Sequence, residues 1–352
     1  MREIFIGNKL IGNNSPAFII AEAGVNHNGD IRLAKKLVDS SVKSGADAVK
    51  FQTFVVDEGT PKSLEKVEYQ KSSNSNESMY QMLKRLEFGY DEFREIRDYC
   101  RLKNIMFLST ASDFKSLKII NDLEVPAYKV GSADISNIPL VSKIAEYGKP
   151  IILSTGMSEL NEIYEAIEAI EKEGNDKIVL LQCTSNYPTS FDNINLNVIT
   201  SFKDIFDYPI GFSDHSIVSE ISVAAVAMGA KVIERHITTD NDLPGPDHSS
   251  SLNPLNFSKM VEKIRNVEQS FGSFTKKTLK SEKHVKELMR RSIFTVKNLS
   301  AGHIINKEDI KIMKSEGGLH PRYYEKIVGK KILNDKLAFE KIKKDDIYDY
   351  KD

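Results

Sequence analysis

Eight short apolar segments alternate with amphipathic helical patterns along most of the chain, and this alternation restricts the fold more than any other feature. Apolar segments of this length, bounded by turn residues, are typical of strands buried in a parallel sheet. The expected strands are residues 17–24, 46–53, 105–110, 127–132, 151–155, 178–184, 209–214 and 231–236. Helical patterns lie between most of them, for example at residues 31–45, 90–104 and 161–174, and residues 255–271 provide an eighth helix.

Eight βα units in about 270 residues match the count and length of a TIM barrel, (β/α)8, so we expect an α/β barrel fold. An open doubly wound sheet is the structural alternative, but the chain has neither a G-x-G-x-x-G motif nor a P-loop. We assign residues 1–272 to the barrel, the Lys-rich residues 273–285 to a linker, and residues 286–352 to a small β-rich domain. Residues 67–78 are expected to form a long polar loop, and no repeat other than the βα unit is evident.

The composition excludes several classes of partner. Lys and Arg number 49 against 50 Asp and Glu, so the net charge of −1 gives no basic excess to attract nucleic acid or an acidic membrane. No apolar run reaches the roughly 18 residues that cross a bilayer, and the first ten residues have no signal-peptide core. Cys100 and Cys183 are too far apart to form a C-x-x-C motif. We therefore expect a cytoplasmic protein.

Polar residues stand near the carboxyl end of nearly every expected strand, where burial alone would favour Val, Ile and Leu. In TIM barrels the reacting groups lie at these ends, because the barrel holds them rigidly while the loops vary. The sequence therefore predicts one large polar pocket. Its candidate residues, in strand order, are Glu22, Asn26 and His27; Lys50 and Gln52; Ser109 and Thr110; Lys129 and Ser132; Ser154 and Thr155; Cys183, Thr184 and Ser185; Ser213, Asp214 and His215; and Glu234 and His236.

Lys50 and Lys129 lie inside apolar strands, and a buried lysine is costly unless it is paired. One interpretation is a structural ion pair with a neighbour such as Glu22. Another is a pair of cations that binds a phosphate or carboxylate ligand, and a Schiff-base lysine is a third.

His215 and His236 end adjacent strands, which lie about 4.8 Å apart in a sheet, so two imidazoles there can reach one ion. A hydrogen-bonded pair of core histidines is the alternative. Two protein ligands, with others from substrate and water, suit an open catalytic site for Mn²⁺, Co²⁺ or a similar ion.

The segment LPGPDHSS, residues 243–250, follows the eighth strand. Its two prolines stiffen a loop from which Asp247 and His248 can project into the pocket mouth, and a rigid surface turn with an N-capping Asp is the alternative. His27 is a weaker candidate in the loop after the first strand. His284, His303 and His320 lie outside the barrel and are expected to be surface residues.

Eight segments along the barrel, taken in order, resemble the sialic acid synthase family. The segments are AEAGVNHNGD (21–30), VKFQTF (49–54), YKVGSAD (128–134), PIILSTGM (150–157), QCTSNYP (182–188), GFSDHS (211–216), VIERHIT (232–238) and LPGPDHSSSLNP (243–254). The last domain resembles the antifreeze-like (SAF) domain that this family carries. The resemblance implies a synthase that condenses phosphoenolpyruvate with N-acetylmannosamine or a modified relative. It also implies a homodimer in which the small domain closes the partner's pocket.

The resemblance also assigns roles to residues. His215 and His236 match ligands of a divalent metal, expected to be Mn²⁺ with Mg²⁺ or Co²⁺ possible, and Glu234 matches an acidic residue beside them. The positions around phosphoenolpyruvate are Lys50, Thr110, Lys129, Ser132, Ser154 and Ser213. Those near the sugar or reacting centre are Glu22, Gln52, Asn74, Asp134, Tyr187 and Asp247, and Ser185 is a further substrate-binding candidate at its strand end.

The chain departs from the family pattern mainly at the sugar. Ala111 and Ser112 stand where the family often has Pro-Phe, and Gln182 where it often has His. Asp134 replaces a Glu, and Lys314 of the small domain replaces an Arg that reaches the sugar's N-acyl group from the neighbouring subunit. Lysine cannot make the bidentate fork of arginine, so these changes suit a different acceptor, such as the diacetamido 6-deoxy sugars of legionaminic or pseudaminic acid synthesis.

Two other functions remain open from the residues. A Schiff-base aldolase would use Lys50 or Lys129 as a covalent nucleophile. A non-catalytic carbohydrate-binding protein on the same barrel would not need both lysines and both histidines together.

Overall fold

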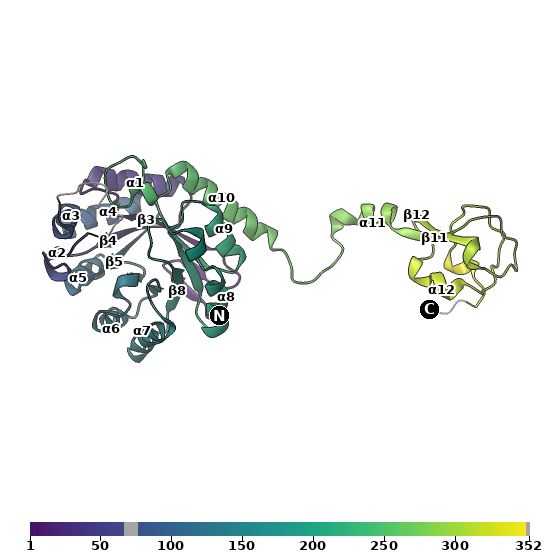
Figure 1. Ribbon diagram of the computed structural model, residues 1–352, viewed down its shortest axis with the longest axis horizontal. Helices are drawn as coiled ribbons and strands as arrows, with labels where there is room; N and C mark the ends of the chain where they lie inside the picture. Colours follow the sequence, from purple (N-terminus) through teal and green to yellow (C-terminus); the bar gives the residue numbers. More distant parts are fainter. Residues whose placement is uncertain (67–76, 350–352) are drawn as a thin grey trace. The chain divides into compact units, whose positions relative to one another are not determined.

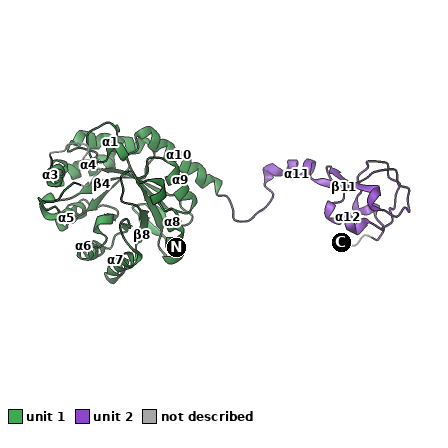
Figure 2. Cartoon of the chain, viewed as in Figure 1, with its two compact units in different colours: residues 1–271 green, residues 272–352 purple. Residues whose placement is uncertain are grey.

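The computed structural model describes residues 1–66 and 77–349, and the chain divides into two compact units (Figures 1 and 2). The first unit comprises Met1–Phe271 and the second Gly272–Asp352. Each unit is described by itself below.

The first unit is a closed barrel of eight parallel strands, so the predicted TIM-barrel fold is confirmed (Figure 1). The strand order around the barrel is β10-β3-β4-β5-β6-β7-β8-β9. The strands are β3 (Phe18–Gly24), β4 (Ala48–Thr53), β5 (Met106–Ala111), β6 (Tyr128–Val130), β7 (Ile151–Ser154), β8 (Ile178–Cys183), β9 (Ile210–Asp214) and β10 (Val232–His236). All eight expected segments are strands of the barrel, each within a residue or two of its predicted bounds.

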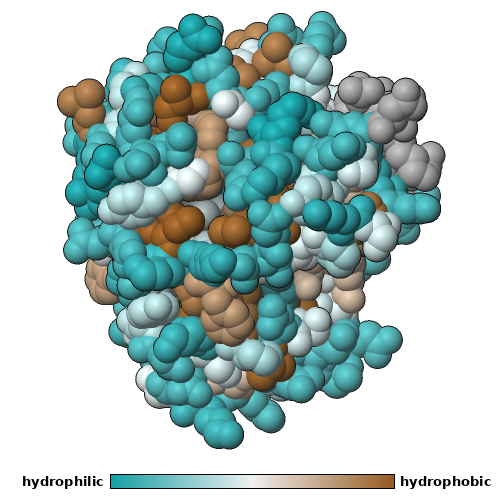
Figure 3. Space-filling model, turned by 90° about the vertical axis from the view of Figure 1, so that its left-hand side faces the viewer, coloured by the Kyte–Doolittle hydropathy of each residue, from teal (hydrophilic) through white to brown (hydrophobic). Residues whose placement is uncertain are grey.

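Helices surround the barrel, and several of them begin at residues suited to that position. Pro254 is the first residue of the last barrel helix, where a proline loses no hydrogen bond, and the side chain of Asn253 caps that helix. The helices are α1 (Ile31–Lys43), α2 (Val56–Gly59), α3 (Met79–Leu86), α4 (Tyr90–Leu102), α5 (Phe114–Asp122), α6 (Ile138–Ala145), α7 (Leu160–Lys172), α8 (Asn197–Ile205), α9 (Glu220–Ala227) and α10 (Pro254–Ser270). The face of the barrel unit visible in Figure 3 is mostly hydrophilic with separated hydrophobic patches, as expected for amphipathic helices that face water.

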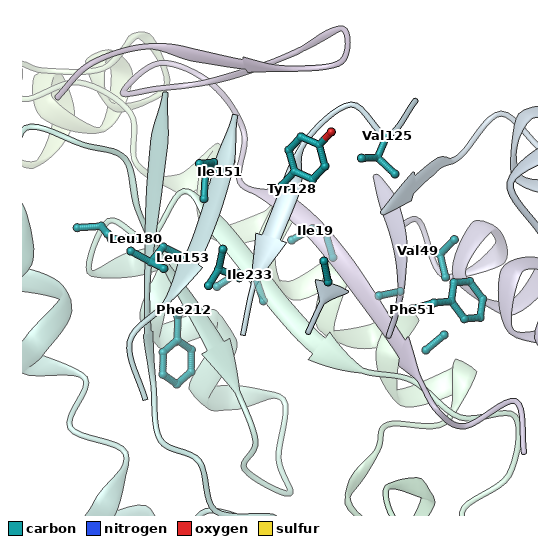
Figure 4. Packing of buried hydrophobic residues seen from close by; sticks show 14 of the residues in the cluster. Ile19, Val49, Phe51, Val125, Tyr128, Ile151, Leu153, Leu180, Phe212 and Ile233 are labelled. Atoms are coloured by element: carbon teal, nitrogen blue, oxygen red, sulfur yellow. The ribbon is translucent and has the colours of Figure 1, made fainter. Parts of the chain in front are cut away.

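Side chains that point outward from the strands form the main hydrophobic core between the barrel and its helices. Figure 4 shows part of this cluster, including Ile19, Val49, Phe51, Tyr128 and Phe212. These residues are buried because helices cover the outside of the barrel, which explains why the strands read as continuous apolar runs.

The barrel interior changes from apolar to polar along the strand direction. Side chains from the early part of the strands, such as Phe18, Ile20 and Ala48, form a second buried cluster. An N-terminal hairpin of β1 (Ile4–Ile6) and β2 (Lys9–Ile11) adds three isoleucines to this cluster. The hairpin was not predicted, and it fills the end of the barrel at which the strands begin. The other end is therefore left for polar groups.

The second unit contains a two-stranded antiparallel sheet of β11 (Arg291–Thr295) and β12 (Ile310–Lys314), with helices α11 (Lys283–Met289) and α12 (Tyr324–Ile327). Nine buried hydrophobic residues, including Ile293, Ile305 and Ile342, form its own core. The small β-rich domain expected from the sequence is present.

The second unit also contains an internal repeat that the sequence interpretation missed, so that prediction was wrong. Residues 293–310 and 330–347 make reciprocal main-chain hydrogen bonds, and Leu299 and Lys336 each donate to the other's carbonyl at 2.9 and 2.8 Å. Two further reciprocal pairs join the segments: Gly302 N to Ile332 O with Phe339 N to Thr295 O, and Ile305 N to Lys330 O with Ile342 N to Ile293 O. Each segment also has an equivalent bond of its own, Val296 N to Asp309 O in the first and Leu333 N to Asp346 O in the second. Only the short motifs NKEDI (306–310) and KKDDI (343–347) carry this repeat in the sequence.

Within residues 1–66 and 77–349, no helix has both the length and the apolar character that a bilayer span requires.

Candidate active site

A cavity of about 390 Å³ opens at the carboxyl ends of the barrel strands. The structure brings most of the predicted site residues together around it. These are Glu22, Lys50, Gln52, Thr110, Lys129, Ser132, Asp134, Ser154, Ser185, Tyr187, Ser213, His215, Glu234 and His236. Period-two alternation explains the position of the strand residues among them, because every second residue of a barrel strand points inward. The others follow strand ends in the loops; they are Ser132, Asp134, Ser185, Tyr187 and His215.

Lys50 is held by two carboxylates and a hydroxyl inside the cavity. Its Nζ lies 2.7 Å from Glu22 Oε2 and 3.7 Å from Glu234 Oε2, and it donates a hydrogen bond of 3.1 Å to Thr110 Oγ1. The Lys50 side chain is only 3% exposed. The ion pair with Glu22 considered from the sequence is therefore present, and it lines the cavity rather than the outer core.

Lys129 contributes a second buried ammonium from the neighbouring part of the barrel. Its Nζ donates to Ser154 Oγ at 2.7 Å and lies 3.9 Å from Glu234 Oε1. Ser213 Oγ donates to the same Glu234 oxygen at 3.1 Å. Glu234 thus stands between the two lysines and is the carboxylate that both share.

The two glutamates differ in protonation because their surroundings differ. Burial raises the pKa of Glu22 to about 7, and Glu234 adds to this effect while Lys50 opposes it. Burial also acts on Glu234, but Lys129 and Lys50 together lower the pKa of its carboxyl below the ordinary value. Glu22 is therefore a group that can gain or lose a proton near neutral pH, whereas Glu234 stays ionised.

The pKa values of the two lysines also shift in opposite directions. Burial lowers the pKa of Lys129 from its ordinary value, whereas Glu22 and Glu234 overcome the effect of burial and raise the pKa of Lys50. Of the two, Lys129 is more readily deprotonated.

His215 and His236 face each other across the ends of β9 and β10, with ring centroids 5.6 Å apart. His215 Nδ1 lies 2.8 Å from the Thr184 carbonyl oxygen, which can only accept, so Nδ1 carries a proton and Nε2 is the nitrogen with a lone pair when the imidazole is neutral. Among the described residues, the buried His236 Nδ1 has no hydrogen-bond partner. Burial lowers the pKa of His236 well below its usual range, which keeps this imidazole neutral.

These features fit a divalent metal ion. An imidazole binds a metal in its neutral form, and a charged imidazole loses its proton when the metal binds. His236 is neutral, whereas Cys183 and the Thr184 carbonyl overcome the effect of burial and raise the pKa of His215. The carbonyl partner of His215 fixes its tautomer in the way that outer-sphere partners of metal-bound histidines do. In the described part of the chain, no group of three or more His, Cys, Asp or Glu side chains is placed to hold an ion. The protein would therefore supply two ligands and leave other positions open.

The loop after β10 brings Asp247 behind His236. Asp247 Oδ2 lies 3.9 Å from His236 Nδ1, and burial raises the pKa of this carboxyl to about 6. Asn26, from the loop after β3, holds this loop by donating from Nδ2 to Ile237 O and Ser251 Oγ, both at 2.9 Å. Asp247 is thus buried against the site rather than part of a surface turn.

The two remaining histidines of these loops are buried outside the cavity. His27 stacks on Phe88 with centroids 4.1 Å apart, and His248 Nδ1 lies 2.6 Å from Thr238 Oγ1. Neither side chain lines the cavity. Their role is to pack the loops that carry Asn26 and Asp247.

Several predicted pocket residues do not line the cavity, so these predictions were wrong. Some belong to loops or to outward-facing strand positions, because only every second strand residue points inward; they are Asn26, His27, Ser109, Thr155, Thr184, Asp214, Asp247 and His248. Asn74 lies outside the described residues, and Lys314 is the exposed last residue of β12 in the second unit. Conversely, Met79 and Met157 line the cavity and were not predicted. Both are apolar, and Met79 comes from helix α3 after the long polar loop, so no strand-end pattern could indicate it.

Fold and cavity together define the class of this molecule. It is a (β/α)8-barrel protein with an enzyme-like site, in which two ammonium groups, three carboxyl groups and two imidazoles converge at the carboxyl ends of the strands.

Comparison with known proteins identifies the family. The model of the NeuB family matches residues 37–276, and the SAF domain model matches residues 290–347. The chain belongs to the NeuB family and carries a C-terminal SAF domain.

Three relatives illustrate the similarity. An uncharacterized protein of Methanocaldococcus jannaschii is 42% identical over 99% of both chains. The N,N'-diacetyllegionaminic acid synthase of Legionella pneumophila is 41% identical over 93% of both chains. The crystal structure of the N-acetylneuraminic acid synthetase of Leptospira borgpetersenii, in complex with citrate, superimposes with a TM-score of 0.72 at 35% identity, covering 81% of this chain and 95% of that one.

Proposed function

We propose that this protein is a nonulosonic acid synthase that condenses phosphoenolpyruvate with an open-chain N-acetylmannosamine-type sugar and releases phosphate. The observation that carries the proposal is the convergence of Lys50, Lys129, Glu22 and two imidazoles in one buried cavity. Membership of a family that includes acid synthases of this kind supports it.

Lys50 and Lys129 are the groups proposed to bind phosphoenolpyruvate. Two ammonium groups face the fixed negative charge of Glu234 and the variable charge of Glu22. Glu234 lies within 4 Å of both lysines, so a single carboxylate is shared by two ammonium groups, and this favours an anionic ligand between them. Thr110 and Ser154, which already accept hydrogen bonds from the lysines, add hydroxyl donors for phosphate or carboxylate oxygens.

The proposed reaction forms one carbon–carbon bond and replaces the bond from C2 to the phosphate oxygen by a bond from C2 to the oxygen of water. C3 of phosphoenolpyruvate attacks the sugar aldehyde carbon, and the aldehyde oxygen takes up a proton to become a hydroxyl. Water then adds to the cationic C2 and loses a proton, and the tetrahedral intermediate expels inorganic phosphate to leave the 2-keto acid. Glu22, with a pKa of about 7, is the proposed acceptor of the proton from water. The ionised Glu234 stabilises positive charge at C2.

A divalent ion, for which we propose Mn²⁺ with Mg²⁺ and Co²⁺ as alternatives, would be held by His215 and His236 and would supply Lewis-acid activation of the aldehyde oxygen. Tyr187, whose ring centroid lies 4.1 Å from that of His215, would then form the wall against which the sugar lies. Holding both reactants in one cavity lowers the entropic barrier to their encounter.

The side chains that face the sugar indicate the class of acceptor. Asp134 lines the cavity with a side chain one methylene shorter than the Glu that the family often has. We propose an N-acyl amino sugar, with the diacetamido 6-deoxy sugars as the leading candidates because the sugar-facing positions depart from the family pattern.

A coupled assay tests the function. The protein is incubated with phosphoenolpyruvate, Mn²⁺ and either N-acetylmannosamine or a diacetamido 6-deoxy sugar, and released phosphate is measured. We expect phosphate release that depends on both the sugar and the metal. Sugar binding without phosphate release from any sugar would instead favour a carbohydrate-binding protein.

A Schiff-base aldolase is the second candidate, because burial lowers the pKa of Lys129 and a deprotonated lysine is a nucleophile. Borohydride reduction in the presence of pyruvate separates the two. A mass increase on Lys129 or Lys50 would support the aldolase, and an unmodified protein that releases phosphate supports the synthase.

We also propose a domain-swapped homodimer in which the SAF domain, through Lys314, completes the sugar site of the partner. Light scattering is expected to give a dimer. A fully active monomer would contradict this assembly.

A further inference from the structure

A buried ion pair lies on the outer side of the barrel directly behind the two histidines. Arg235 Nη1 is 2.7 Å from Asp214 Oδ2, and both side chains are completely buried. Arg235 and Asp214 are also direct partners in the register of β10 on β9. The pair therefore links the carboxyl ends of these two strands by side chains as well as by the main chain.

Each member of the pair precedes one histidine in the sequence. Asp214 is followed by His215, and Arg235 by His236. Because successive side chains of a strand point to opposite faces, His236 faces the cavity while Arg235 faces outward. A fixed separation of Asp214 and Arg235 thus fixes the separation of the two imidazoles.

The same pair also fixes the turn that carries His215. Asp214 accepts hydrogen bonds from Ser216 N at 2.8 Å and from Ser222 Oγ at 2.5 Å. Arg235 donates to Ser216 Oγ at 3.1 Å and to the Ser216 carbonyl. Both the amide N–H and the carbonyl oxygen of Ser216 are therefore hydrogen-bonded, and this restricts the main chain of the adjacent His215.

Stability alone does not account for this pair. Desolvation of two charges offsets most of their attraction, and well-packed apolar residues often replace such a pair at no cost in stability. What an apolar pair does not reproduce is the set of directed hydrogen bonds around Ser216.

We propose that Arg235 and Asp214 are positioning residues that hold His215 and His236 at the spacing required by one divalent ion. This inference rests on the metal site of the proposed function and assigns its geometry to two residues outside the cavity. Outer-shell partners of metal ligands typically change metal affinity 10- to 100-fold when they are removed. We expect an effect of that size.

The test compares wild type with the double variant Asp214→Leu/Arg235→Met. The double change removes both charges, so that neither is left buried and unpaired. Mn²⁺ alone is titrated by isothermal calorimetry, circular dichroism follows the fold, and a separate titration measures phosphoenolpyruvate. We expect a folded variant whose Kd for Mn²⁺ rises about 10- to 100-fold while its Kd for phosphoenolpyruvate stays within about twofold of wild type.

Two further variants make the result decisive. The exposed pair Lys263 and Glu220, 2.6 Å apart on α10 and α9, gives the control Glu220→Gln/Lys263→Gln, which should bind Mn²⁺ as wild type does. Arg235→Lys keeps the buried charge balanced but loses the guanidinium fork, so we expect weaker Mn²⁺ binding even if the double variant does not fold.

The outcomes separate this inference from the proposed function. A wild-type Kd for Mn²⁺ in the folded double variant, or in Arg235→Lys, would overturn the positioning role and leave the proposed function standing. Wild-type protein that binds no Mn²⁺ would overturn the metal site and this inference together.

Discussion

Replacement of Glu22 by glutamine is the sharpest test of the proposed chemistry. The change keeps the shape of a side chain that is only 2% exposed and removes its charge. In wild type, a carboxylate oxygen of Glu22 lies 2.7 Å from Lys50 Nζ, and the other accepts a hydrogen bond from Gln52 Nε2. The glutamine places an uncharged amide next to Lys50, and its amide oxygen can still accept from Gln52. The cavity should therefore persist without its titratable base.

The expected size of the effect follows from the pKa. Because burial raises the pKa of Glu22 to about 7, about one-tenth of the carboxyl is ionised at pH 6 and about nine-tenths at pH 8. A base acts in its ionised form, so kcat/KM should rise about tenfold between these pH values and level off above them. Glu22→Gln should lower kcat/KM by about 10²- to 10⁴-fold and remove this rise.

The assay measures released phosphate at saturating Mn²⁺ between pH 5.5 and 9. Asp134 gives a matched control, because burial also raises the pKa of this cavity carboxyl, to about 6. The variant Asp134→Asn should retain the rise near pH 7. If Glu22→Gln keeps that rise, or if Asp134→Asn abolishes it, Glu22 is not the base.

Three other variants test separate parts of the site. Lys129→Met should raise the KM for phosphoenolpyruvate about 10- to 100-fold, since a charge-assisted hydrogen bond contributes about 1.5–3 kcal/mol, and an unchanged KM would remove this lysine from the anion site. His236→Ala should abolish Mn²⁺-dependent turnover while circular dichroism stays that of wild type, and full activity after metal chelation would contradict this. Asn26→Asp removes the donor to Ile237 and Ser251, so the KM for the sugar should rise while that for phosphoenolpyruvate does not; a parallel rise in both would indicate general damage to the barrel.

The sequence predicts the barrel and most of the cavity because both depend on one local rule. Strand side chains alternate between the two faces, and parallel strands end at the same rim, so residues such as Lys50, Lys129 and His236 can be placed together without knowledge of the fold's details. The same rule fails for residues that reach the site from loops and helices. Met79 lines the cavity from α3, and its position depends on how a long loop folds.

Contacts between segments far apart in the chain could not be predicted from the sequence either. The sequence of the hairpin Ile4–Ile11 gives no sign of its position. Its isoleucines pack against the apolar layer inside the barrel, and this contact is known only from the structure. Arg235 reads as a strand residue of no special interest, because its partner Asp214 is identified only by the register of β10 on β9. The repeat in the second unit is visible mainly in main-chain hydrogen bonds, which many sequences can form.

On the proposed function, the ion pair of Glu22 and Lys50 connects the binding of phosphoenolpyruvate to proton transfer. Glu22 Oε2 lies 2.7 Å from Lys50 Nζ, which keeps a buried ammonium paired. On the proposed function, an entering phosphate or carboxylate competes with Glu22 for this lysine. The displaced carboxylate loses its nearest cation and lies close to a new negative charge, and both changes raise its affinity for a proton. When phosphate leaves, the pairing with Lys50 is restored and the proton is released. On the proposed function, the ion pair between Glu22 and Lys50 would therefore link the protonation of Glu22 to the presence of the substrate.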